Sequence, residues 1–202
     1  MTYKYDVFLS YRRANAWPKF VDDIFLPMFR HWLSAELGRN PEVFFDADCI
    51  ETGMQWPNEL AMGVASSRLM VCLWSREYFS SDWCMAELSH MMARRTACDP
   101  VNPPPLVLAV IIHDGEQLPV ELSGIQQFPI QAYSNPWMRQ DSQRAEELSE
   151  KLIKLAMHVA RALDQIPDYD ASWQVLATEQ FIQLFHRKVP QTTPPSLGGL
   201  PE

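Results

Sequence analysis

Two stretches of this sequence, residues 68–74 and 106–112, are almost continuously apolar. A β-strand with one face in water alternates apolar and polar residues, whereas a strand covered on both faces is apolar throughout. Sheets of the second kind are mostly parallel, because the crossover helices that join parallel strands pack on both of their faces. These two stretches therefore predict the central strands of a parallel sheet and point to an α/β fold.

Shorter strand and helix patterns alternate around these two segments. We expect further strands at residues 5–10, 42–46 and 128–130, and helices at residues 27–37, 56–65, 83–95 and 148–163. Pro27 falls in the first turn of its helix, where a missing N–H is tolerated, and Gly38 ends that helix. Strands that alternate with helices form βαβ units. The expected fold is a doubly wound parallel sheet of about five strands with helices on both faces.

The chain divides into one domain and a C-terminal extension. Residues 1–165 hold the alternating strands and helices, and this length is sufficient to bury a core. Residues 166–188 carry one more amphipathic pattern, which predicts an extra helix that either packs back on the domain or serves as a docking surface. Residues 189–202 are rich in Pro, Gly and Thr, a composition typical of a disordered tail.

Charge and cysteine content argue against several classes of function. The formal net charge of −8 disfavours direct binding to nucleic acid or to an anionic membrane, since both need a basic surface. The cysteines (Cys49, Cys72, Cys84, Cys98) and the five histidines lack the spacing of a metal site. There is no secretory leader and no apolar run of the roughly 20 residues that a membrane helix needs. We expect a cytoplasmic protein with no metal and no membrane or nucleic-acid partner, in which Cys72 and Cys84 are buried.

Doubly wound sheets bind their ligands at the carboxyl ends of the strands. Four informative segments are expected at that edge, namely residues 10–13, residues 46–53, Trp74 with Ser75, and the helix start at Trp83. None has the Gly-rich sequence of a dinucleotide or P-loop site, or the Gly-x-Ser-x-Gly elbow of a hydrolase. A phosphoacceptor domain needs acids after its first strand and an Asp at the end of its third, and this sequence has neither.

Trp83 and Glu87 lie four residues apart in an expected helix, so the indole and the carboxylate share one face. Three polar residues that can cap the helix start come just before or at its beginning: Ser80, Ser81 and Asp82. An apolar stripe marks the buried side of this helix and consists of Cys84, Leu88 and Met91. Glu87 lies at the edge of that stripe rather than on the far face, so its position needs an explanation.

Four motifs occur in the order and spacing of a known family. They are Tyr5-Asp6-Val7-Phe8-Leu9-Ser10-Tyr11, the loop from Phe45-Asp46-Ala47-Asp48 through Gly53, Ser75-x-x-Tyr78-x-x-Ser81, and Trp83-Cys84-x-x-Glu87-Leu88. Together they resemble a TIR (Toll/interleukin-1 receptor) domain over residues 1–163. The resemblance implies a flavodoxin-like fold, and it implies either a signalling adaptor or an enzyme that cleaves NAD⁺.

The resemblance also implies roles for individual residues. In the NAD⁺-cleaving members, the glutamate that matches Glu87 is catalytic, and Trp83 matches the tryptophan paired with it. Arg12 and Arg13 resemble a double arginine that follows the first strand in some of these enzymes. The loop at residues 46–56 matches the BB loop, which contributes to assembly and to closing the active site. The substrate-binding residues expected on this basis are Phe8, Ser10, Arg12, Arg13, Asp46, Asp48, Glu51, Gly53 and Trp83.

A single glutamate suits this reaction. The bond between ribose and nicotinamide in NAD⁺ already has a cationic leaving group, so no general acid is needed to protonate it. The transition state needs stabilisation of an oxocarbenium-like sugar, which one carboxylate beside the ribose can provide. An aromatic wall can hold the nicotinamide or ribose face, and Arg12 or Arg13 can pair with the diphosphate. NAD⁺ is therefore the expected substrate, with no cofactor.

Structural interpretations of the same residues stay open. Glu87 can serve the fold alone, Trp83 can be core packing, and the two arginines can be solvated. The acids of the loop at residues 46–56 can shape turns, and Gly53 can supply backbone freedom.

The leading hypothesis is an NAD⁺ nucleosidase that releases nicotinamide and leaves ADP-ribose or a cyclic ADP-ribose product. Short TIR domains of this kind resemble those of bacterial antiphage immunity, in which self-assembly activates the enzyme. The expected partners are NAD⁺, further copies of the chain in a homo-oligomer or other TIR–TIR assembly, and a separate sensor or activator subunit. The alternatives are a non-enzymatic adaptor that recruits other TIR domains and an effector that acts on host TIR signalling.

Overall fold

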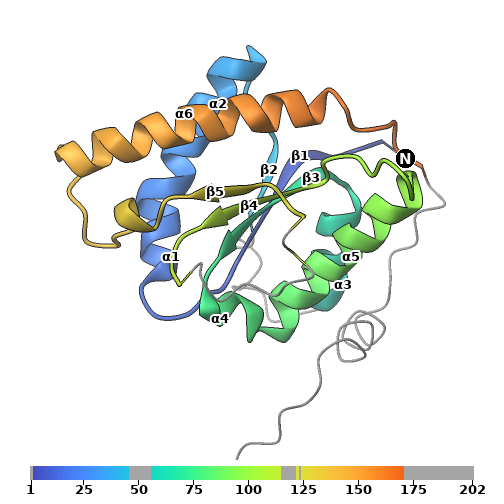
Figure 1. The fold of residues 1–202 in the computed structure, drawn as a ribbon, viewed down its shortest axis with the longest axis horizontal. Coiled ribbons are helices and arrows are strands. Elements are labelled where there is room, and N and C mark those ends of the chain that lie inside the picture. Colours follow the sequence, from blue (N-terminus) through green and yellow to red (C-terminus); the bar gives the residue numbers. More distant parts are fainter. Residues whose placement is uncertain (1, 46–55, 115–121, 123, 171–202) are drawn as a thin grey trace, which may run out of the picture.

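The computed structural model describes residues 2–45, 56–114, 122 and 124–170. Within them the strands are β1 (Tyr5–Tyr11), β2 (Val43–Phe44), β3 (Ser67–Trp74), β4 (Val107–Ile111) and β5 (Gln127–Pro129). The α-helices are α1 (Trp17–Phe20), α2 (Leu26–Leu37), α3 (Trp56–Ala65), α4 (Arg76–Phe79), α5 (Asp82–Cys98) and α6 (Gln143–Leu163) (Figure 1). A π-helical turn, Val21–Phe25, joins α1 to α2, and a 3-10 turn, Gln131–Tyr133, follows β5.

The strands form one parallel sheet in the order β2-β1-β3-β4-β5. Leu9 of β1 pairs with Val71 of β3, and Val71 pairs in turn with Leu108 of β4. This is the flavodoxin-like order, in which the winding direction reverses between β1 and β3. The predicted doubly wound sheet is therefore confirmed. The reversal brings the carboxyl ends of β1 and β3 side by side, at the point where sheets of this type bind ligands.

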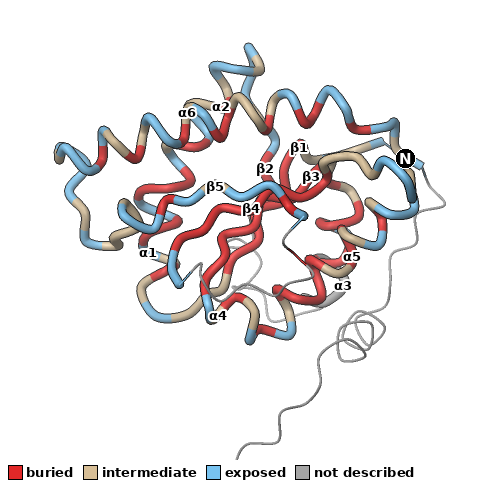
Figure 2. The backbone as a smooth tube through the Cα atoms, viewed as in Figure 1, coloured by how far each residue is buried: buried red, intermediate tan, exposed pale blue. Residues whose placement is uncertain are grey.

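Helices cover both faces of the sheet (Figure 1). On one face α2 packs against α6, with α1 beside them, and on the other face α3 packs against α5. Figure 2 shows β3 and β4 buried between these two layers. The two apolar stretches at residues 68–74 and 106–112 thus form the central strands, as predicted. The other predicted strands and helices of the domain also occur. The helix at residues 56–65 has the predicted bounds, and the others have shifted ends.

The first helical region begins earlier than the sequence predicts. The helix expected at residues 27–37 corresponds to α2, and Gly38 follows it in the left-handed conformation at φ 64°. Upstream of it, α1 and the π-helical turn are also helical and contribute buried residues. Proline has no N–H and disturbs a regular helix. Just before Pro27 the helix widens, and the amide of Leu26 bonds to the carbonyl of Val21 five residues earlier. This local widening lets the helical region continue upstream of Pro27.

Two short elements also differ from the predictions. β2 has two residues, whereas a strand was expected over residues 42–46, and it pairs with β1 alone at the edge of the sheet. The single-turn helix α4 was not predicted. Its cap is Ser75, whose hydroxyl accepts a hydrogen bond from the amide of Tyr78 at 3.3 Å. The predicted extra helix and the tail at residues 189–202 lie outside the described residues.

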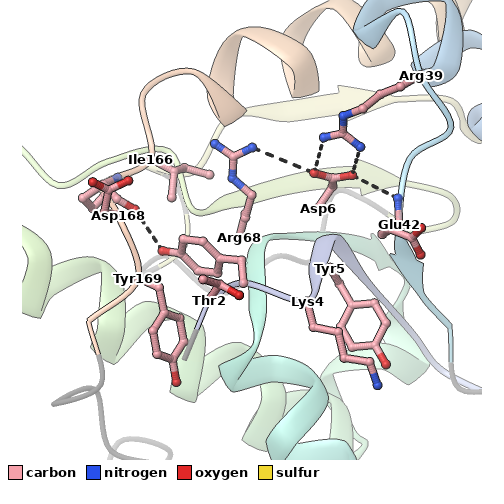
Figure 3. Close-up of a pocket in the computed structure, with 12 residues that line it drawn as sticks. Thr2, Lys4, Tyr5, Asp6, Arg39, Glu42, Arg68, Ile166, Asp168 and Tyr169 are labelled. Carbon is pink, nitrogen blue, oxygen red and sulfur yellow. Dashed lines mark hydrogen bonds and ion pairs between the residues drawn. The ribbon is translucent and has the colours of Figure 1, made fainter.

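An ion cluster joins β1, β3 and the segment that leads into β2 at the amino edge of the sheet. The buried carboxylate of Asp6 accepts two hydrogen bonds from the guanidinium of Arg39, both 2.7 Å, and one from the amide of Glu42 at 3.0 Å. The guanidinium of Arg68 lies 3.9 Å from the same carboxylate. Figure 3 shows both arginines directed at Asp6. All three residues line a cavity of about 520 Å³. The contacts of Asp6 are therefore those of a structural clamp.

We expect Asp6→Asn to lower the free energy of unfolding by about 1–2 kcal/mol at neutral pH, because it removes charge-assisted bonds to a half-exposed arginine. Burial raises the pKa of Asp6, but the hydrogen bonds from Arg39 and the Glu42 amide and the charges of Arg39 and Arg68 outweigh it and leave the pKa below 3.8. The stabilisation is therefore present above about pH 4 and is lost as the pH falls through the lowered pKa. Urea unfolding from neutral pH down to about pH 2 measures both effects.

The matched control is Asp141→Asn, which removes an exposed ion pair with Arg139. It should change the free energy of unfolding by less than about 0.5 kcal/mol. Equal losses of unfolding free energy in Asp6→Asn and Asp141→Asn would contradict the role given to the cluster. So would an unfolding free energy that falls with pH in Asp6→Asn as it does in the parent.

Candidate functional site

The first turns of α5 carry Trp83 and Glu87. The helix begins after Ser81, whose hydroxyl accepts a hydrogen bond from the amide of Cys84 at 3.4 Å. Of the three residues predicted as capping candidates, Ser81 is the one that caps the helix. The predicted apolar stripe of α5 is buried. The helix is thereby fixed with one face on the sheet and with Glu87 one turn after Trp83.

Glu87 is directed into the domain and is only 8% exposed. Its Oε2 atom accepts a hydrogen bond from the hydroxyl of Ser10 at 2.5 Å, a length found for O–H donors to an ionised carboxylate. Ser10 is the last residue but one of β1 and pairs with Cys72 of β3. The bond therefore joins α5 to the carboxyl ends of these two strands, where the fold binds ligands.

Tyr78 of α4, which was not among the predicted site residues, completes this polar cluster. Its side chain is fully buried. Its hydroxyl lies 2.8 Å from the Ser10 hydroxyl and 3.3 Å from the carbonyl oxygen of Cys84. The sequence signal was its place in the motif Ser75-x-x-Tyr78-x-x-Ser81. Nothing in the spacing indicated which polar groups the phenol would meet.

The two arginines after β1 take different positions. Arg12 is half-buried, and its guanidinium donates to the Ser81 hydroxyl at 3.1 Å, so its charge lies at the amino end of α5. The guanidinium of Arg13 lies 5.9 Å from the ring centroid of Tyr11. Burial raises the pKa of Asp22, and the charge of Arg13 partly offsets that rise. Arg12 therefore belongs to the cluster around α5, whereas Arg13 is directed towards the helices of the other face.

Two buried thiols accompany the carboxylate. Burial raises the pKa of Cys72 to about 12, with a hydrogen bond to Tyr78 opposing the rise and the charge of Glu87 adding to it. Burial and the charge of Glu87 also raise the pKa of Cys84. Both thiols stay protonated at neutral pH and are poor nucleophiles. Their predicted burial is confirmed, and Glu87 is left as the group suited to charge stabilisation or proton transfer.

The other predicted site residues fall into three groups. Phe8 lies in the core, two residues before Ser10 on the same side of β1, and stacks on Phe44 with ring centroids 5.0 Å apart. Trp83 is half-buried and packs against the core. Four predicted residues of the loop after β2 lie outside the described residues: Asp46, Asp48, Glu51 and Gly53. Contact of any of these residues with substrate stays a prediction.

The described residues show no group of His, Cys, Asp and Glu arranged to hold a metal ion. Over the same part of the chain, none of the helices combines the length and the apolar character needed to cross a membrane. What the site offers chemically is a buried carboxylate with a hydroxyl donor on it, a guanidinium at a neighbouring helix start, and an indole one turn away.

Comparisons with known proteins give one family. A family profile described as TIR domain matches residues 7–148, a range that includes Ser10, Tyr78 and Glu87. The TIR domain of the Toll-related receptor TRR-2 from the lower metazoan Hydra magnipapillata is 12% identical, with a TM-score of 0.48, over 78% of this chain and 99% of that one. The TIR domains of the activated Roq1 resistosome, which recognises the pathogen effector XopQ, are 19% identical, with a TM-score of 0.39, over 91% of this chain and 98% of that one.

Proposed function

Because this chain belongs to the TIR domain family, we propose that it is an NAD⁺ nucleosidase, which cleaves the bond between nicotinamide and ribose. The observation that carries the proposal is the Glu87 carboxylate, held by Ser10 at the carboxyl ends of β1 and β3. Doubly wound sheets bind ligands at this position. Glu87 also matches the catalytic glutamate of the NAD⁺-cleaving TIR domains.

The proposed cleavage depends on charge stabilisation. The nicotinamide nitrogen is formally positive in NAD⁺, so it takes the electron pair of the breaking bond and leaves as a neutral base. Positive charge then develops on the ribose around C1′. A carboxylate next to the ribose stabilises that charge, and Glu87 supplies it. Trp83, one turn before Glu87, supplies an aromatic surface for the nicotinamide or the ribose.

Arg12 gives the diphosphate of the substrate a partner. Its guanidinium is anchored to Ser81, and a guanidinium has five N–H donors, so others are available to phosphate oxygens. The amino end of α5 adds a favourable dipole for an anion. Arg13 is the weaker candidate, because its guanidinium lies beside the Tyr11 ring. The family resemblance gives the loop at residues 46–56 a part in closing the active site, and residues 46–55 of it lie outside the described residues.

The proposed enzyme works as an assembly of several copies. TIR–TIR contacts would complete the open edge of the site, and a separate sensor or activator subunit would trigger them, in a role in bacterial antiphage immunity. Attack of water on C1′ after nicotinamide leaves gives ADP-ribose, whereas attack by a group of the substrate itself gives a cyclic product. Both outcomes share the first bond cleavage.

A non-enzymatic adaptor, or an effector that acts on host signalling through TIR–TIR contacts, is the competing function. The observation that favours it is the burial of Glu87. A carboxylate that is 8% exposed and bonded to a strand can serve the fold alone. The two functions make opposite predictions for a substitution that removes the charge of Glu87 and keeps its size.

Glu87→Gln keeps the shape of the side chain and an oxygen that can accept from Ser10, but it removes the charge. We expect nicotinamide release from NAD⁺ to fall at least about 100-fold, a loss typical of removing a group that acts in the transition state. Chromatography of concentrated protein incubated with NAD⁺ measures the release. The control is Glu150→Gln, an exposed helical glutamate on α6.

The control should retain the parent activity, and urea unfolding of both variants checks the fold. Equal release by the parent and Glu87→Gln would contradict the role of Glu87. A parent that binds other TIR domains but releases no nicotinamide, even when concentrated and assembled, would favour the adaptor.

We expect nicotinamide release per protein molecule to rise with protein concentration, because assembly completes the site. Rates measured over a dilution series, with analytical ultracentrifugation of the same samples, compare activity with oligomeric state. A rate per molecule that stays constant from dilute monomer to concentrated protein would contradict activation by assembly.

A further inference from the structure

The hydroxyl groups of Tyr78 and Ser10 form a buried hydrogen-bonded chain that leads to the Glu87 carboxylate. We propose that Tyr78 is a positioning residue that acts on Glu87 through Ser10, and that this chain holds the carboxyl group in one orientation whether it is ionised or protonated. The catalytic consequence rests on the proposed function. The chain itself is a property of the fold and is testable without activity.

Counting protons gives the direction of the chain when Glu87 is ionised. Each hydroxyl has one proton to donate, and an ionised carboxylate only accepts. The proton of Ser10 therefore points to Oε2 of Glu87, 2.5 Å away. The Ser10 oxygen then accepts the proton of Tyr78, across 2.8 Å. In this state the carbonyl of Cys84 receives no proton from Tyr78.

The direction reverses when Glu87 takes up a proton. The carboxyl group then donates to Ser10, Ser10 donates to Tyr78, and the phenol turns its proton to the carbonyl oxygen of Cys84 at 3.3 Å. Within the chain of Glu87, Ser10 and Tyr78, each of the three protons now has an acceptor. The thiol of Cys72, which also has a hydrogen bond to Tyr78, keeps its own proton in both states. The Cys84 carbonyl therefore makes the second state possible without moving any heavy atom.

The surroundings favour such a chain. Tyr78 is fully buried, and burial raises its pKa well above the ordinary value, so the phenol keeps its proton. Among the described residues, the charge of Glu87 acts on the protonated thiols of Cys72 in β3 and Cys84 in α5. Arg12 is a cation close to Cys84, and its charge lowers the pKa of that thiol against the larger effect of burial. The phenol and the two thiols therefore keep their protons, which leaves the carboxyl group of Glu87 as the acid of this cluster.

This behaviour suits both steps of the proposed reaction. In the first step nicotinamide leaves with the electron pair of the C–N bond, and the ionised carboxylate stabilises the positive sugar. In the second step an O–H nucleophile forms a bond to C1′ and gives its proton to the Glu87 carboxylate. The chain reverses as that proton arrives, and it returns to its first direction when Glu87 releases the proton to solvent.

The test uses two substitutions that each remove one hydroxyl, Ser10→Ala and Tyr78→Phe. Each has a matched control elsewhere in the fold. The control for Ser10→Ala is Ser67→Ala, which removes a buried strand hydroxyl that donates to the Gly63 carbonyl at 2.7 Å. The control for Tyr78→Phe is Tyr3→Phe, which removes a tyrosine hydroxyl that donates to the Pro167 carbonyl at 3.1 Å.

The first readout is the titration of Glu87, followed by carbon NMR of protein with labelled glutamate carboxyl groups and assigned with Glu87→Gln. Losing a donor to the ionised form raises the midpoint of a carboxyl group. We expect a rise of about one pH unit in Ser10→Ala and a smaller rise in Tyr78→Phe, as for the loss of one charge-assisted bond. The two controls should titrate as the parent does.

The second readout is the rate of nicotinamide release as a function of pH and of NAD⁺ concentration. We expect kcat to fall about 10-fold in Ser10→Ala and less in Tyr78→Phe. KM should change little in Tyr78→Phe, because Ser10 lies between the Tyr78 hydroxyl and Glu87. The acid limb of the pH profile should move upward with the NMR midpoint.

An unchanged Glu87 midpoint in both chain variants would overturn the inference, as would equal shifts in the chain variants and their controls. If Ser10→Ala fails to fold, Tyr78→Phe decides by the same criterion. A shifted midpoint in a protein that releases no nicotinamide would support the chain and reject the proposed enzyme. Nicotinamide release that depends on Glu87, with an unshifted Glu87 midpoint in the chain variants, would support the proposed enzyme and reject the chain.

Discussion

In a parallel sheet covered by helices on both faces, polar side chains can reach water in two places. These are the amino edge, where the strands begin, and the carboxyl edge, where they end. All remaining positions on the central strands face a helix and require an apolar side chain. In this chain β3 and β4 are buried along almost their whole length. Polar side chains on the inner strands therefore lie at the amino and carboxyl edges. At each edge the buried polar atoms need hydrogen-bond partners.

The buried carboxylates at the two edges have different kinds of partner. At the amino edge, Asp6 is matched by the charges of Arg39 and Arg68, and its hydrogen bonds join segments of the chain. At the carboxyl edge, the carboxylate of Glu87 faces a hydroxyl, and Ser10 is followed by the phenol of Tyr78. An ion cluster fixes one protonation state, whereas a chain of hydroxyls accommodates two. The edge with hydroxyls is therefore the one suited to chemistry.

Much of the fold follows from local patterns, because continuous apolar runs and helical periodicity depend on neighbouring residues alone. The helix predicted at residues 27–37 is present as α2, but the helical turns before it were missed, because Pro27 is accommodated by a π-helical turn. Glu87 could be singled out by its place at the edge of an apolar stripe. Tyr78 could not, because its partner Ser10 lies 68 residues earlier and only the folded sheet brings them together.

The central claim is that NAD⁺ binds beside Glu87 at the carboxyl edge. The most direct test titrates an uncleavable NAD⁺ analogue into isotope-labelled protein and maps the amide shifts by NMR. We expect amide shift changes that centre on Ser10, Arg12, Ser81 and Glu87. Changes confined to the cavity around Asp6 and Arg68, or none at saturating analogue, would contradict that claim.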